Sequence, residues 1–135
     1  MRKEFYTGIW LTLICLVMVG CSRRELTAEQ MEQMMSAEVP VGSDASRAIS
    51  FYVGRQIEHS GIVQLKDEDR NSPDTLFGDP KLNAVRHRIQ SYVPAIKRDV
   101  GGKGFLTRWD ILMRFYLDGD GKVVAHQAKK IGTSL

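Results

Sequence analysis

The chain has few cysteines, few prolines and no apolar run long enough to span a bilayer, and these shortages narrow the classes of protein it can belong to. Its 135 residues include two cysteines and four prolines. Both cysteines, Cys15 and Cys21, lie near the N-terminus. A fold stapled by several disulfides is therefore excluded. The 43% of hydrophobic residues and the lack of a low-complexity tract also argue against a wholly disordered chain.

The net charge of the chain is small and positive. The chain has 19 Lys and Arg residues against 16 Asp and Glu residues, and removal of residues 1–20 leaves 17 against 15. A nucleic-acid binder that relies on phosphate neutralisation carries a much larger basic surplus. We therefore expect no nucleic-acid partner.

The N-terminus has the organisation of an export signal. Arg2 and Lys3 precede an uncharged stretch, residues 9–19. A helix needs about 20 apolar residues to span a bilayer, and this stretch is shorter. It suits the apolar region of a cleaved signal peptide. Removal of residues 1–20 leaves 115 of the 135 residues, which is enough for one small domain.

The end of this segment, Met18-Val19-Gly20-Cys21, resembles the bacterial lipoprotein signal. The resemblance implies cleavage after Gly20 and attachment of acyl chains such as palmitate to Cys21, which would hold the chain on a membrane. Ser22 follows the cysteine, where Gram-negative lipoproteins retained at the inner membrane carry Asp, so it implies the outer membrane, facing the periplasm. Residues 21–26 are then the lipidated cysteine and tether, and residues 27–135 a single domain without cysteine.

Two helices are predicted at the start of this domain. Thr27 and Gln30 have the spacing of a capping box, and Met31, Met34 and Met35 then share one helical face. Such a face is more often buried than used as a partner groove. After a break at residues 39–42, Ser43 or Asp44 is expected to cap a second helix that ends at Gly61. Its apolar stripe comprises Ala45, Ile49, Tyr52, Val53 and Ile57, widened by Ala48 and Phe51.

The middle of the chain is less regular. Residues 66–80 are rich in charges and turn formers and predict an exposed loop. Asp79-Pro80 could cap a short helix carrying Leu82, Val85 and Ile89, whereas the alternation of Val85, His87 and Ile89 equally permits a strand. Both alternatives stay open.

The last third predicts an antiparallel meander over residues 92–100, 109–117 and 122–131. Asp118-Gly-Asp-Gly supplies the second turn. Alternation places Trp109, Ile111, Met113, Phe115 and Leu117 on one face, and Leu112, Arg114 and Tyr116 on the other. The larger apolar row is the better core candidate, although alternation alone leaves open which face is solvated. The expected fold class is α+β, with two short N-terminal helices packed on a three-stranded antiparallel β-meander.

No metal, cofactor or catalytic residue is predicted. A calcium loop that starts at Asp118 or two residues earlier would place Lys129 or Gln127 where a bidentate carboxylate is required. The three histidines lie far apart in sequence, outside any zinc-binding spacing: His59, His87 and His126.

The order of these elements resembles small bacterial envelope lipoproteins, whose fold is shared by the barrel-assembly accessory lipoprotein and by each half of the beta-lactamase inhibitor protein. The resembling stretches are residues 39–43, residues 95–100 and, above all, the hairpin of residues 111–124 with its Asp-Gly-Asp-Gly-Lys turn. The resemblance implies that the domain binds other proteins through its sheet or loops.

Two functions follow as hypotheses. The first is a non-enzymatic, lipid-anchored periplasmic lipoprotein that contacts another envelope protein in an accessory or inhibitor-like role. Aromatic and arginine side chains dominate interface energies, so its candidate contact residues are Trp109, Arg114, Tyr116 and Tyr92, of which Trp109 is equally a core candidate. The second is a lipid-anchored hydrolase or small-ligand carrier, for which the sequence offers only scattered polar residues: Ser60, His59, His87, His126, Asp99 and Asp110.

Overall fold

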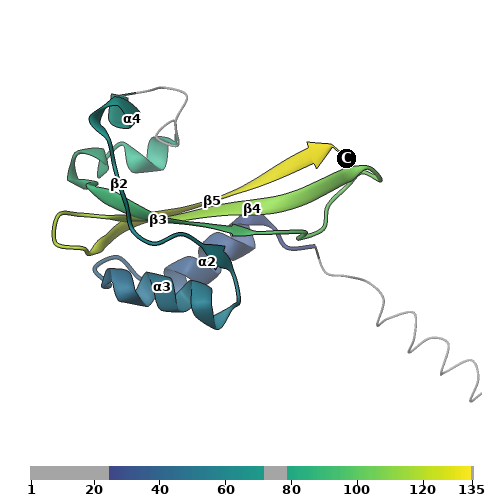
Figure 1. The fold of residues 1–135 in the computed structure, drawn as a ribbon, viewed down its shortest axis with the longest axis horizontal. Helices are drawn as coiled ribbons and strands as arrows, with labels where there is room; N and C mark the ends of the chain where they lie inside the picture. The colour runs from purple at the N-terminus through teal and green to yellow at the C-terminus, as the bar shows by residue number, and fades with distance from the viewer. Residues whose placement is uncertain (1–24, 72–78, 135) are drawn as a thin grey trace, which may run out of the picture.

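A computed structural model describes residues 25–71 and 79–134 as an α+β domain (Figure 1). Two helices pack on one face of a mostly antiparallel sheet. The predictions for the export signal and for the lipidation of Cys21 concern residues outside these ranges.

Helix α2, Ala28–Glu38, begins with the predicted capping box. The Gln30 amide donates to Thr27 Oγ1 at 3.1 Å, and the Thr27 amide donates to Gln30 Oε1 at 3.0 Å. Met31 and Met35 are buried and Met34 is partly buried against the same core. Burial of the methionine face is therefore confirmed.

Helix α3, Ala45–Gly54, is shorter than predicted. It ends at Gly54, the poorest helix former in the stretch, and the chain reverses at Gln56, which has a positive φ of 54°. Its buried residues are Ala48, Phe51 and Tyr52. Ala48 and Phe51 were expected at the margin of the apolar stripe, whereas Val53, expected within the stripe, is 60% exposed. Asp44 occupies the cap position without a side-chain capping bond and pairs instead with Lys122.

The predicted meander is present as β3, β4 and β5, with bounds Ser91–Lys97, Thr107–Leu117 and Val123–Ser134. The sheet also has two short strands that the prediction of three did not include: β1, Glu58–His59, and β2, Val63–Gln64, both pair antiparallel with β3. The spatial order is β1-β3-β4-β5, with β2 also on β3. A two-residue strand is too short to show an alternating pattern in a sequence, so β1 and β2 could not be recognised.

The turn between β4 and β5 has the expected hairpin form. Asp118 Oδ1 accepts from the amides of Asp120 at 2.9 Å and Lys122 at 3.0 Å. Gly121 has a φ of +72°, in the left-handed region that favours glycine.

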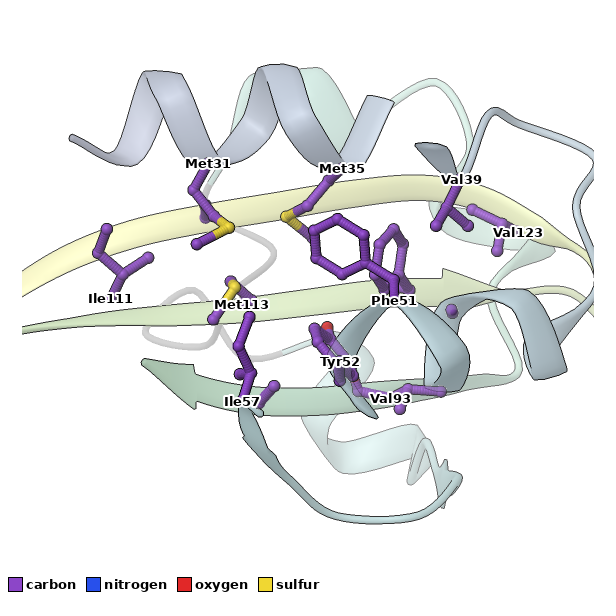
Figure 2. Packing of buried hydrophobic residues seen from close by; sticks show 14 of the residues in the cluster. Met31, Met35, Val39, Phe51, Tyr52, Ile57, Val93, Ile111, Met113 and Val123 are labelled. Carbon is purple, nitrogen blue, oxygen red and sulfur yellow. The ribbon is translucent and has the colours of Figure 1, made fainter. Parts of the chain in front are cut away.

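The sheet separates two cores. The larger core lies between the helices and the sheet, as Figure 2 shows, and there the apolar row of β4 is buried as predicted. Phe115 stands at its centre, with ring contacts to Phe51 and Tyr52. The smaller core lies on the opposite face and consists of Leu82, Ile89, Tyr116 and Val124, with Leu65, Val85, Tyr92 and Ala125 beside them.

Residues 65–89 form the cover of this smaller core, outside the undescribed residues 72–78. The acidic stretch expected as a loop forms the short helix α4, Asp67–Asn71. For residues 80–89, where the sequence permitted a helix or a strand, the structure has two short 3-10 helices: η2, Pro80–Leu82, and η3, Arg86–Arg88. Asp79 caps η2 by accepting from the Lys81 amide at 3.0 Å.

The hairpin turn generates a stability prediction. Gly121→Ala should lower the free energy of unfolding by about 1 kcal/mol, because a side chain is strained at positive φ even though the space around Gly121 is open. Gly119→Ala in the same turn is the control, since Gly119 lacks a positive φ and an added Cβ would meet only Gln90 at 3.9 Å. Thermal unfolding should separate the variants by roughly 4 °C. Equal melting temperatures would contradict the turn geometry.

Candidate functional site

The face of the sheet opposite α2 and α3, called the outer face below, carries most of the predicted contact residues. Because side chains alternate along a strand, β3 contributes Tyr92, Pro94 and Ile96 to it. The paired register places Leu112, Arg114 and Tyr116 of β4 beside them. Among the described residues, Leu65, Leu82, Val85 and Ile89 cover the outer face at its end near the β4–β5 turn, where they pack with Tyr116 and Val124.

Tyr116 lies under this cover and is fully buried. Its hydroxyl is 2.9 Å from Gln127 Oε1, and burial raises its pKa above the usual value. The prediction that Tyr116 contacts a partner is therefore wrong. The physical reason is that Leu82 and Ile89 pack over it, which the ambiguous pattern of residues 80–89 did not reveal.

Tyr92 and Arg114 lie at the border between the covered and the open parts of the outer face. Both are half-buried. The Arg114 guanidinium stands 4.6 Å from the centroid of the Tyr92 ring, which in turn lies 6.3 Å from the Tyr116 ring. Stacking on an aromatic face holds a guanidinium in one orientation while leaving its donors available. Arg114 is thus presented in an ordered position.

Between this border and the buried Asp110, the described residues cover the outer face only in part. Pro94, Ile96, Leu112 and Arg114 form what we call the open patch, and all four residues are partly buried and partly accessible. An open groove of about 260 Å³ runs between the patch and β1, with Glu58 and Ser60 on its far side. Pro94 and Ile96 were missed as contact candidates, although the alternation of residues 92–96 places them on the same face as Tyr92.

An ion pair borders the open patch. Arg98 Nε donates to Glu58 Oε2 at 2.9 Å, and this bond lowers the pKa of Glu58. On the opposite edge of the patch, Lys129 of β5 lies beside Leu112 in the strand register and is exposed. The patch therefore has an apolar centre and a charged border.

Trp109 is on the helix face rather than the outer face. It packs partly buried against the larger core, and its indole Nε1 donates to the Lys103 carbonyl at 2.8 Å. An added Cβ at Gly102 would lie 2.4 Å from Trp109 Cδ1, so the ring rests directly on that glycine. Of its two open roles, the structure favours a core role at the sheet's end.

Asp110 is buried and serves the fold. Its Oδ1 accepts from the Asp99 amide at 2.9 Å, and its other oxygen is 3.5 Å from Arg108 Nε. Asp99 has a positive φ of 55°, so Asp110 supports the turn of the chain after β3. This arrangement gives both residues a structural role.

The histidines do not come together. His59 is on β1 and His126 on β5, with two strands between them, roughly 14 Å apart across the sheet. His59 Nδ1 is 3.0 Å from the Ile57 carbonyl and its ring stacks on Tyr52, whereas His87 is exposed in η3. Within residues 25–71 and 79–134, no group of three His, Cys, Asp or Glu side chains could hold a metal ion.

Comparisons with known proteins found no match, so a function has to be inferred from the residues of this chain. The chain matches no protein-family model, no curated protein and no solved structure. Among the described helices, none is both long and apolar enough to pass through a membrane.

The setting of His126 generates a pH prediction. Burial against the sheet lowers the pKa of His126 from 6.5, while Glu32 of α2 opposes this shift and Lys81 of η2 adds to it. The folded state thus prefers the neutral ring. Its contribution to stability is complete above pH 6.5 and is lost as the pH falls through the lowered pKa.

The melting temperature of the protein should therefore fall between pH 7 and pH 5, and His126→Gln should flatten that decline. His87→Gln is the control, because His87 is exposed in η3 and should leave the pH profile unchanged. A steep decline in the His126→Gln variant would show that another group is responsible.

Proposed function

We propose that the protein is a non-enzymatic, lipid-anchored lipoprotein of the bacterial envelope that binds another envelope protein through the open patch. The observation that supports this most directly is the half-covered outer face. Leu65, Leu82, Val85 and Ile89 cover the end of that face near the β4–β5 turn, and the apolar residues of the open patch stay partly accessible.

The composition of the open patch supports a protein partner. Protein interfaces combine an apolar centre with a polar border, and arginine is enriched among residues that dominate binding energy. Ile96 and Leu112 supply the centre, and Arg114 stands beside them, stacked on Tyr92. Arg114 and Lys129 add positive charge, so the matching surface on the partner is expected to combine an apolar protrusion with acidic residues.

The proposed anchor rests on the N-terminal sequence, and the start of the domain is consistent with it. The Leu26 amide donates to the Val100 carbonyl at 3.1 Å, and Glu25 pairs with Lys130 at 2.8 Å. Residues 25 and 26, expected in the tether, thus already belong to the domain. A lipid on Cys21 would hold the domain close to the membrane, with its acyl chains on the outer membrane's periplasmic side.

The arrangement of two helices before an antiparallel sheet supports the resemblance to small envelope lipoproteins of the accessory or inhibitor kind. A hydrolase or ligand carrier needs a base, an orienting carboxylate and a hydroxyl that converge. In the groove beside the patch, His59 turns toward Tyr52, and Glu58 pairs with Arg98. Among the described contacts, neither residue bonds to the Ser60 hydroxyl as a member of a catalytic pair would, and this favours the binding role.

The open patch gives the test of partner binding. Leu112→Asp should abolish complementation of a deletion strain, because it places a charge at the apolar centre of the interface. Val53→Asp, at a 60% exposed apolar residue of α3, should complement fully. Arg114→Glu should also weaken complementation through charge reversal. Circular dichroism and thermal unfolding should confirm that all three variants fold.

Photo-crosslinking provides the physical counterpart. A photoreactive residue at position 112 should yield one dominant crosslinked envelope protein, and the same residue at position 53 should not. Full complementation by well-folded Leu112→Asp and Arg114→Glu variants would contradict the proposed site. If complementation instead required His59 or Ser60, while the Leu112→Asp and Arg114→Glu variants complemented fully, the hydrolase function would be favoured.

The anchor has its own prediction. Cys21→Ala should leave a precursor of all 135 residues that incorporates no labelled palmitate, because the thioether requires a sulfur at that position. Cys15→Ala is the matched control and should be processed and labelled normally, since Cys15 lies in the segment that is removed. Gel mobility and fatty-acid labelling measure both properties. Normal labelling of the Cys21→Ala protein would contradict the lipoprotein assignment.

A further inference from the structure

The loop between β3 and β4, residues 101–106, exposes two adjacent large apolar side chains. Phe105 is 97% exposed and Leu106 is 61% exposed. The other exposed large apolar residues are each separated from one another in sequence: Val41, Val53 and Ile62. Neither Phe105 nor Leu106 belongs to either core, so the fold does not explain their apolar character.

The loop lies at the end of the sheet where the described chain begins (Figure 1). The Leu26 amide donates to the Val100 carbonyl directly before the loop, and a Cβ at Gly101 would lie 3.8 Å from Glu25 Cα. The neighbouring strands hold each part in place: Lys130 of β5 pairs with Glu25, and Trp109 of β4 donates to the Lys103 carbonyl. The bond from Lys130 lowers the pKa of Glu25, and the charge of Lys103 adds to this shift.

The loop is also held in place. Trp109 rests on Gly102, where a Cβ would lie 2.4 Å from the indole, and Gly101 and Gly104 have positive φ values of 78° and 111°. These glycines allow a tight path, and Phe105 and Leu106 project from it into solvent. Two apolar side chains exposed in this way can enter an apolar environment outside the domain without any change in the fold.

The sequence limits the distance between this loop and Cys21. Only three residues lie between Cys21 and Glu25, and an extended chain spans at most about 3.6 Å for each of the four steps, or roughly 14 Å in total. Two of the intervening residues, Arg23 and Arg24, are basic, as is Lys103 in the loop. The opposite end of the sheet, with the β4–β5 turn and Val41, is separated from the loop by the eleven residues of β4.

We propose that Phe105 and Leu106 insert into the interfacial region of the lipid bilayer beside the acylated Cys21, with Lys103 near lipid phosphates. This inference rests on the proposed lipid anchor and extends it. An anchor alone leaves a domain free to turn, whereas a second contact beside it fixes one orientation. The β4–β5 turn then points away from the membrane, and the open patch stands beside the bilayer, where a membrane-embedded or membrane-bound partner can reach it.

The test uses the full chain, expressed in bacteria, purified and placed in vesicles of phosphatidylethanolamine and phosphatidylglycerol. The acylated Cys21 has no free thiol, so an environment-sensitive dye can be attached to Phe105→Cys or, as the control, to Val41→Cys. Both positions are exposed and apolar, at opposite ends of the sheet. Mass spectrometry of each protein reports the acyl chains independently of the dye.

The dye at position 105 should shift its emission to shorter wavelength on the vesicles and be quenched by bromine in the lipid tails, whereas the dye at position 41 should show neither effect. A dye at Leu106→Cys should lose most of its shift when Phe105→Ser is added. An acylated protein whose dye at position 105 behaves like that at position 41 would overturn the inference and leave the anchor intact. A crosslink from position 105 to a protein in that case would assign the loop to a protein partner. A mass without acyl chains would contradict the anchor, and the inference would fall with it.

Discussion

The packing of Phe115 on helix α3 is the contact on which the rest of the molecule depends. Its ring meets Phe51 at 5.7 Å and Tyr52 at 5.4 Å between centroids. Tyr52 in turn donates through its hydroxyl to the Val93 carbonyl of β3 at 3.1 Å, so one aromatic cluster joins α3 to two strands. Burial raises the pKa of Tyr52 and keeps this hydroxyl in its donor form. Residues 27–135 contain no cysteine, so this core holds the domain together without disulfide bonds.

The position of β4 connects this core to the proposed function. Because β4 is paired on both sides, its inward residues face the helices and its outward residues form the second face. The helices pack on the helix face of β4 and form the larger core with it. On the outer face, Leu65, Leu82, Val85 and Ile89 cover only the part of β4 near Tyr116. The same strand that organises the core therefore leaves an apolar surface open. The loop before β4 places a further apolar pair next to the N-terminus.

The regular elements could be predicted from the sequence because they follow a simple period. The capping box of α2, the alternation of residues 109–117 and the Asp-Gly-Asp-Gly turn are each local patterns, and each is present as expected. The short strands β1 and β2 and the cover formed by residues 80–89 depend on tertiary packing instead, and for this reason the sequence did not predict them. The same limit explains the error at Tyr116. Alternation identifies which residues share a face, but a polar or aromatic row does not reveal whether another segment lies over it.

Carbene footprinting of the protein in native envelopes and after purification can measure whether a partner occupies the open patch in the cell. Ile96 and Leu112 should be labelled in the purified protein and protected in envelopes, while Val53 of α3 should be labelled equally in both. Equal labelling of Ile96 and Leu112 in the two preparations would contradict partner binding at the open patch.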